Sequence, residues 1–233
     1  CRVSLLRASN EKQASQILAH SWNVIRRSLK TLKRYTGTAG CSEVTAVWLT
    51  RFVQNLESFE ESALVSHALE SVEMPDMTHI VQSNYYKQLE EAGHGLNEGS
   101  TQPMSQIQSY CMSLSLELHP TCPAVWKQFS RMMLTQMNAV SDKQCLLCNC
   151  VMALSKCIQL GNSGNIDVES LLEIFRLLKE HGDLVLADDV VCELLAITPK
   201  IWSYLSGQLL LLLGHEQSTV CDFTVQILKN VSE

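Results

Sequence analysis

The sequence is poor in residues that interrupt helices, in charge and in aromatic rings. Its 233 residues include only five prolines and ten glycines, and charged side chains make up 18% and aromatic side chains 6%. Few prolines and glycines leave long stretches without a helix breaker, and this profile disfavours a sandwich of short strands. Because 46% of the residues are apolar, the chain is still able to bury a sizeable core. These absences predict an all-α protein.

A long hydrophobic run and a secretory signal are also lacking. The longest apolar run is the five leucines of QLLLLLG, residues 208–214, which is far short of the roughly 20 residues that span a bilayer. No basic segment followed by an apolar one precedes the ten scattered cysteines. We therefore expect no membrane contact and an intracellular, reducing compartment, the cytoplasm or the nucleus. Because the sequence starts at Cys1 and ends within an expected helix, we also expect a piece of a longer protein.

Motifs that carry catalysis or hold a cofactor are missing as well. No serine or cysteine stands in a glycine-flanked turn with a histidine and an acid, and the phosphate-loop and dinucleotide fingerprints are absent. The stretch CLLCNC, residues 145–150, holds one C-x2-C pair, but zinc needs four ligands and no second pair follows. We expect these cysteines to pack a helix, and we predict no enzyme activity, no cofactor and no metal.

Apolar residues at helical spacing recur along nearly the whole chain. A helix opened by Asp142 should end at Leu160, with cysteines on two of its faces. Asp167 should cap the next helix, and Gly182 should stop it. A single helix headed by Pro199 should run through the five leucines.

About ten helices joined mostly by short connections fit either a right-handed stack of helical pairs or triplets or an irregular helical bundle. We expect one continuous domain, residues 1–233, broken mainly by a flexible loop at about 93–102. No internal segment has the alternation of a strand.

The segment LLLLLGHEQSTVCDFTVQILKNVS, residues 209–232, contains a leucine-rich helix, a glycine turn, a polar linker and an amphipathic helix. It resembles the second and third helices of an armadillo-type repeat. The weaker match LLCNCVMALSKCI, residues 146–158, has Lys156 where the family has asparagine. The resemblance implies an armadillo-like α-solenoid, with related HEAT repeats possible for the rest of the chain. The family's offsets in the first segment are occupied by Val220, Thr224, Leu228, Asn230 and Val231, with Thr224 in place of the usual alanine.

The resemblance also implies a role for one polar side chain. In armadillo-type repeats, the asparagine at the position of Asn230 lines a concave groove and hydrogen-bonds the backbone of a bound peptide. Asn230 and Lys156 are therefore candidate partner-binding residues, and the alternative is that Asn230 is a solvent-facing or capping residue near the end of a helix.

Charge is unevenly distributed along the chain. Six basic residues and no acidic one lie between Lys12 and Ser42, whereas residues 43–98 carry ten acidic residues against two basic ones. On a helix, the basic residues of RRSLKTLKR form a cationic face opposite an apolar stripe. This face could bind a partner, pair with the acidic segment that follows, or simply meet water. Its residues are Arg26, Arg27, Lys30, Lys33 and Arg34.

These patterns predict a non-enzymatic scaffold for protein–protein interaction, whose helical-repeat surface meets a partner's helix or extended peptide. The second hypothesis is a nucleic-acid-associated helical protein that uses the cationic face. A net charge of −6 and the lack of interleaved aromatics disfavour it. The third is a closed bundle with a catalytic pocket, for which the sequence offers no candidate residues.

Overall fold

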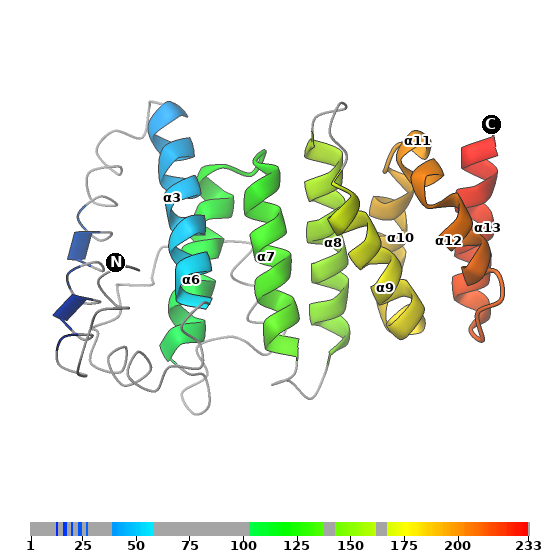
Figure 1. Ribbon diagram of the computed structural model, residues 1–233, viewed down its shortest axis with the longest axis horizontal. Helices are drawn as coiled ribbons and strands as arrows, with labels where there is room; N and C mark the ends of the chain where they lie inside the picture. The colour runs from blue at the N-terminus through cyan, green and yellow to red at the C-terminus, as the bar shows by residue number, and fades with distance from the viewer. Residues whose placement is uncertain are drawn as a thin grey trace. The chain divides into compact units, whose positions relative to one another are not determined.

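The computed structural model describes residues 39–57, 103–137, 143–161 and 167–232, with single positions at 13, 16, 17, 20, 23, 24 and 27 (Figure 1). Within these residues the regular elements are helices and no strand is present, so the predicted all-α class is confirmed. The chain forms two compact units, Cys1–Pro120 and Thr121–Glu233. The expected loop at 93–102 lies outside the described residues, and the single continuous domain stays a prediction.

In the first unit, helix α3 (Ala39–Glu57) packs against helix α6 (Pro103–Leu118). A buried hydrogen bond joins the two helices: the Ser115 hydroxyl of α6 donates to the Ala46 carbonyl of α3 at 3.2 Å. Helix α6 begins with a proline, whose fixed φ and missing N–H suit a first helical turn.

The second unit consists of helices α7 to α13 and has its own core. Helix α8 contacts α7 on one side and α9 and α10 on the other, and α13 contacts α9, α11 and α12 (Figure 1). Phe129, Met132, Leu146 and Leu171 are among its fully buried side chains. The elements are α7 (Pro123–Gln136), α8 (Gln144–Leu160), α9 (Val168–Val185), α10 (Asp188–Leu195), α11 (Pro199–Trp202), the 3-10 turn η3 (Ser203–Leu205), α12 (Ser206–Leu212) and α13 (Ser218–Ser232).

The cysteines of α8 lie on two faces, as predicted. The Sγ of Cys150 is 3.7 Å from the Ser130 carbonyl oxygen on α7, and the Sγ of Cys148 is 3.3 Å from the Leu184 carbonyl oxygen on α9. Burial, then the charges of Asp189 and Cys145, raise the pKa of Cys148 to about 11. At neutral pH this sulfur is therefore a thiol and not the thiolate that binds metals or attacks substrates.

Helix α9 differs from the prediction at its end. It continues past Gly182 to Val185, with a kink at His181, where φ is −136° and ψ is 21°. A Cβ on Gly182 would lie 2.5 Å from the Gln217 Oε1 and closer still to the Val220 Cγ2. Gly182 therefore allows α13 to approach α9 closely, and its expected role as a helix stop is wrong.

The single helix expected after Pro199 is also wrong, because the chain divides into α11, η3 and α12. The Ser203 hydroxyl donates to the Lys200 carbonyl at 2.7 Å, a local bond of the kind that competes with regular helix geometry. Gly207, a poor helix former, follows in the first turn of α12. Because of this interruption, most of the leucine run lies in a short separate helix, α12.

Candidate partner-binding groove

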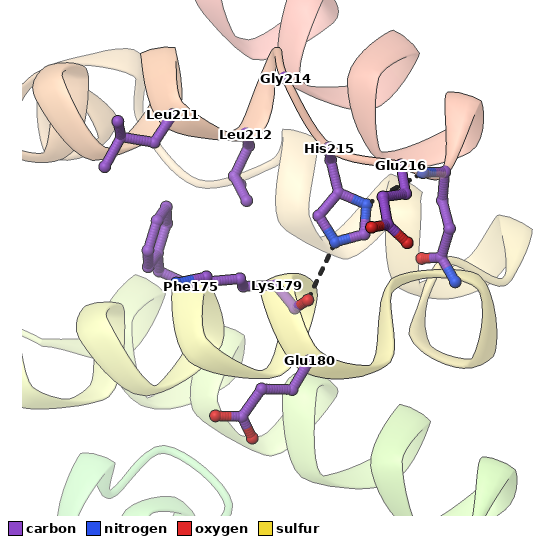
Figure 2. Close-up of a pocket in the computed structure, with 9 residues that line it drawn as sticks. Phe175, Lys179, Glu180, Leu211, Leu212, Gly214, His215 and Glu216 are labelled. Atoms are coloured by element: carbon purple, nitrogen blue, oxygen red, sulfur yellow. Dashed lines mark hydrogen bonds between the residues drawn. The ribbon is translucent and has the colours of Figure 1, made fainter.

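An open groove of about 440 Å³ separates α9 from the turn that joins α12 to α13. Figure 2 shows the ring of Phe175 pointing from α9 toward Leu211 and Leu212 on α12. The opposite end is polar and holds Lys179 and Glu180 of α9 together with His215, Glu216 and Gln217 of the turn. The groove is thus apolar at one end and hydrogen-bonding at the other, which is the usual make-up of a binding site.

The apolar end extends onto an exposed rim. Leu211, which lines the groove, is 74% exposed. On α9, Leu172 lies one turn before Phe175 on the same face and is also exposed. Clustered exposed apolar side chains of this kind are typical of interaction surfaces, since single ones are common but contiguous ones are not.

The His215 ring fastens the turn to α9. Its Nε2 lies 2.9 Å from the Lys179 carbonyl oxygen, and its Nδ1 accepts from the Gln217 backbone N–H at 3.2 Å. A backbone N–H can only donate and a carbonyl can only accept, so these partners assign the neutral ring with its proton on Nε2. Both ring nitrogens are therefore engaged in holding the rim.

A second hydrogen bond crosses the same gap. In an unbroken helix the N–H of Asp183 would donate to the carbonyl of Lys179. At the kink of α9 the Asp183 N–H donates instead to the Gln217 Oε1 at 3.1 Å, while the Lys179 carbonyl accepts from His215. The turn thus satisfies the backbone groups on either side of the kink, which explains why the kink is tolerated.

The charges around the groove are partly neutralised. Arg176 forms ion pairs with Glu173 and Glu180, each at 2.5 Å. Among the described residues, no ion pair engages Lys179 or Glu216, the other two charged side chains that line the groove. Residues 167–222 carry ten acidic and three basic side chains, and Lys127, Arg131 and Lys156 from outside this span pair with Asp167, Glu169 and Glu193, so acids still outnumber bases by ten to six.

Of the residues predicted to bind a partner, Arg27, Lys156 and Asn230 lie within the described residues. Lys156 lies on α8, where its Nζ is 2.8 Å from the Glu193 Oε2, and it ties α8 to α10. Asn230 is exposed on α13 but does not line the groove. Arg27 is exposed, and the other members of the cationic face, Arg26, Lys30, Lys33 and Arg34, lie outside the described residues.

The departure at Thr224 from the armadillo-type pattern has a simple structural explanation. Thr224 is fully buried in α13, and its hydroxyl donates to the Val220 carbonyl at 2.6 Å. Because its only polar side-chain group is satisfied within the helix, threonine fits a position where the family uses a small apolar residue.

The run of five leucines is a sequence feature that could have indicated this groove. Five consecutive leucines on a helix of 3.6 residues per turn surround its whole circumference, so some of them must face away from the core. Leu210, Leu211 and Leu213 are those residues, and Leu211 lines the groove. The role of His215 had no comparable signal, because it depends on the kink in α9.

No protein-family model, curated protein or solved structure matches this chain. Within the described ranges, no helix combines the length and apolar character needed to cross a membrane. No group of three or more His, Cys, Asp or Glu residues in the same ranges could hold a metal ion. The functional assignment therefore rests on the geometry of the groove.

Proposed function

We propose that this chain is a non-enzymatic helical-repeat scaffold, of armadillo or HEAT type, that binds another protein. The groove between α9 and the α12–α13 turn receives a helix or an extended segment of that partner. The observation that carries the proposal is the exposure of Leu211 at 74% beside an open apolar groove, because binding a partner would remove this side chain from water.

The packing of the second unit supports the repeat architecture. Successive helices α7, α8 and α9 each contact the next, and α12 and α13 form a hairpin across a short turn. Contacts between neighbours in sequence are typical of stacked repeats, whose surfaces serve as binding sites.

The polar end of the groove favours recognition over catalysis. The two His215 nitrogens are occupied by backbone groups, and no other group is placed beside the ring as a nucleophile among the residues that line the groove. Leucine and phenylalanine side chains on an open wall suit the apolar anchors of a protein partner.

The proposal is tested by pull-down from cell extract with the wild type, Leu211→Asp and Leu210→Asp. Both leucines are exposed on α12, but only Leu211 lines the groove, so Leu210→Asp is a matched control for charge and fold. We expect the same proteins to be retained by the wild type and the control, and lost by Leu211→Asp. Identical retention by all three proteins would exclude the groove.

The extract should be divided before the pull-down, with half treated with nuclease and each half washed at low and at moderate salt. Retention through a specific protein contact should survive both treatments. Retention that is lost after nuclease treatment would favour the nucleic-acid hypothesis. So would retention that is lost at moderate salt, because phosphate contacts weaken steeply with salt.

A further inference from the structure

Resting on the proposed function, we infer that the occupant of the groove is a basic amphipathic helix of the partner protein. It places a large apolar side chain between Phe175 and Leu211 and a lysine or arginine beside Glu216. The juxtaposition that leads to this inference is an apolar wall at one end of the groove and, at the other, the Glu216 carboxylate, which has no ion-pair partner among the described residues.

The first step concerns the backbone of the occupant. An extended segment needs partners for its own N–H and C=O groups, as a sheet edge or a row of free amides provides. The described residues contain no strand, both His215 nitrogens are taken, and the Gln217 Oε1 accepts from Asp183. A helix satisfies its own backbone and needs only side-chain contacts, so the groove favours a helix.

The second step concerns size. Leu172, Phe175 and Lys179 lie at i, i+3 and i+7 on one face of α9. At 1.5 Å per residue this wall is roughly 10 Å long, the length of about two helical turns. An occupant of two turns presents one or two apolar side chains to the groove, which matches a volume of about 440 Å³.

The third step concerns charge. Residues 167–222 hold ten acidic side chains against six basic ones, three within the span and three that pair with it from outside, which leaves a negative excess. The Glu180 carboxylate is already shared with Arg176, whereas Glu216 has no ion-pair partner in the described part of the chain. A basic side chain at that end therefore gains an opposite charge, and an acidic one meets repulsion. Lys179, the one cation among the described residues that line the groove, should repel a basic occupant.

The test uses three fluorescein-labelled peptides of about 18 residues, long enough to form a helix. They share leucines at i, i+3 and i+7 and differ only in carrying lysine, glutamine or glutamate at the remaining surface positions. Binding to the full chain is measured by fluorescence anisotropy at about 50 mM and about 300 mM salt, because screening separates the charge contribution from the apolar one.

We expect the lysine peptide to bind most tightly. Glu216→Lys should weaken its binding roughly two- to fivefold, and Lys179→Glu should strengthen it by a similar factor. Asp222→Lys, an exposed position that does not line the groove, carries the same charge change as Glu216→Lys and should have a much smaller effect. All these differences should shrink at the higher salt.

Other results separate the two proposals. Tightest binding of the glutamate peptide, or equal binding of all three, would overturn the basic helix but leave the groove in place. So would stronger binding of the lysine peptide by Glu216→Lys together with weaker binding by Lys179→Glu. Binding that Leu211→Asp does not reduce would overturn the groove itself. If no peptide binds, the helical occupant is wrong, and the pull-down with Leu211→Asp still decides whether the groove binds protein.

Discussion

At the scale of single residues, Asp167 combines two stabilising contacts at the start of α9. Its carboxylate accepts from the Ser170 N–H at 3.2 Å and from the Lys127 ammonium at 2.8 Å. Partial burial alone would raise the pKa of Asp167, but the hydrogen bonds from Lys127 and Ser170 outweigh burial and hold the pKa below its ordinary value. The ionised carboxylate is therefore the form that the folded state prefers.

This preference predicts a pH-dependent loss of stability. A carboxyl with a lowered folded-state pKa stabilises the fold above its unfolded pKa of about 3.9, and the contribution is lost as pH falls through the folded value. Asp167→Ala removes both the cap and the ion pair, and should lower the free energy of unfolding by about 1–2 kcal/mol at pH 7. Asp167→Asn keeps a capping oxygen, so it should cost less than about 1 kcal/mol.

Urea unfolding of these proteins between pH 7 and pH 3 measures the effect. The gap between wild type and Asp167→Asn should begin to narrow below about pH 4, where the carboxyl of the unfolded chain becomes protonated, and should narrow further as pH falls toward the lower folded-state pKa. A gap that stays constant over this range would show that the Lys127 contact does not stabilise the fold.

The described cysteines should differ widely in reactivity. Cys192 is exposed, whereas Cys111 and Cys150 are buried and their thiol pKa values are raised by burial. Because the thiolate is the reactive form, iodoacetamide at pH 8 should modify Cys192 first and leave these two unmodified in the folded protein. Mass spectrometry of peptides alkylated before and after denaturation gives the order, and early modification of Cys150 would contradict the packing of α8.

Predictions about single residues were confirmed where the contact involves neighbours in the sequence. Asp167 was predicted as a cap because it precedes an amphipathic stretch. Its carboxylate accepts a hydrogen bond from the N–H of Ser170, a near neighbour in the sequence. Lys156 was chosen from the armadillo-type offset alone. Its pairing with Glu193 depends on how α10 folds back on α8, and no pattern within α8 indicates it.

At the scale of elements, the close approach of α9 and α13 depends on a glycine. Gly182→Ala would push a Cβ against the side chains of Val220 and Gln217, and we expect it to lower the free energy of unfolding by about 1–3 kcal/mol. Gly207 is the matched control, because a Cβ there meets nothing within 4 Å. Gly207→Ala should raise stability by about 0.5–1 kcal/mol through helix propensity. Thermal or urea unfolding of both variants distinguishes these signs, and equal effects would contradict the close contact.

The ends of several helices followed from the sequence, whereas their interruptions did not. The end of α8 at Leu160 and the cap of α9 at Asp167 were predicted from helix-terminus chemistry. The kink at His181 was not, because the groups that compensate it, Gln217 and His215, belong to a distant turn. For the same reason the groove could not be located from either of its walls alone.

At the scale of the whole molecule, the second unit carries a core of its own. Its buried side chains, including Phe129, Met133 and Leu147, come from helices that contact one another within Thr121–Glu233. A polypeptide of residues 121–233 should therefore be helical by circular dichroism and should unfold cooperatively in urea. A gradual, non-cooperative loss of helix would show that this core is insufficient.

The two hydrogen bonds that join the α12–α13 turn to α9 also bear on the speed of recognition. Because His215 and Gln217 already hold the rim, a partner meets a wall that has little left to rearrange. The observed association rate should then rise in proportion to partner concentration, without the plateau that a slow opening step imposes. Differences in affinity among partners would lie mainly in the dissociation rates of their complexes.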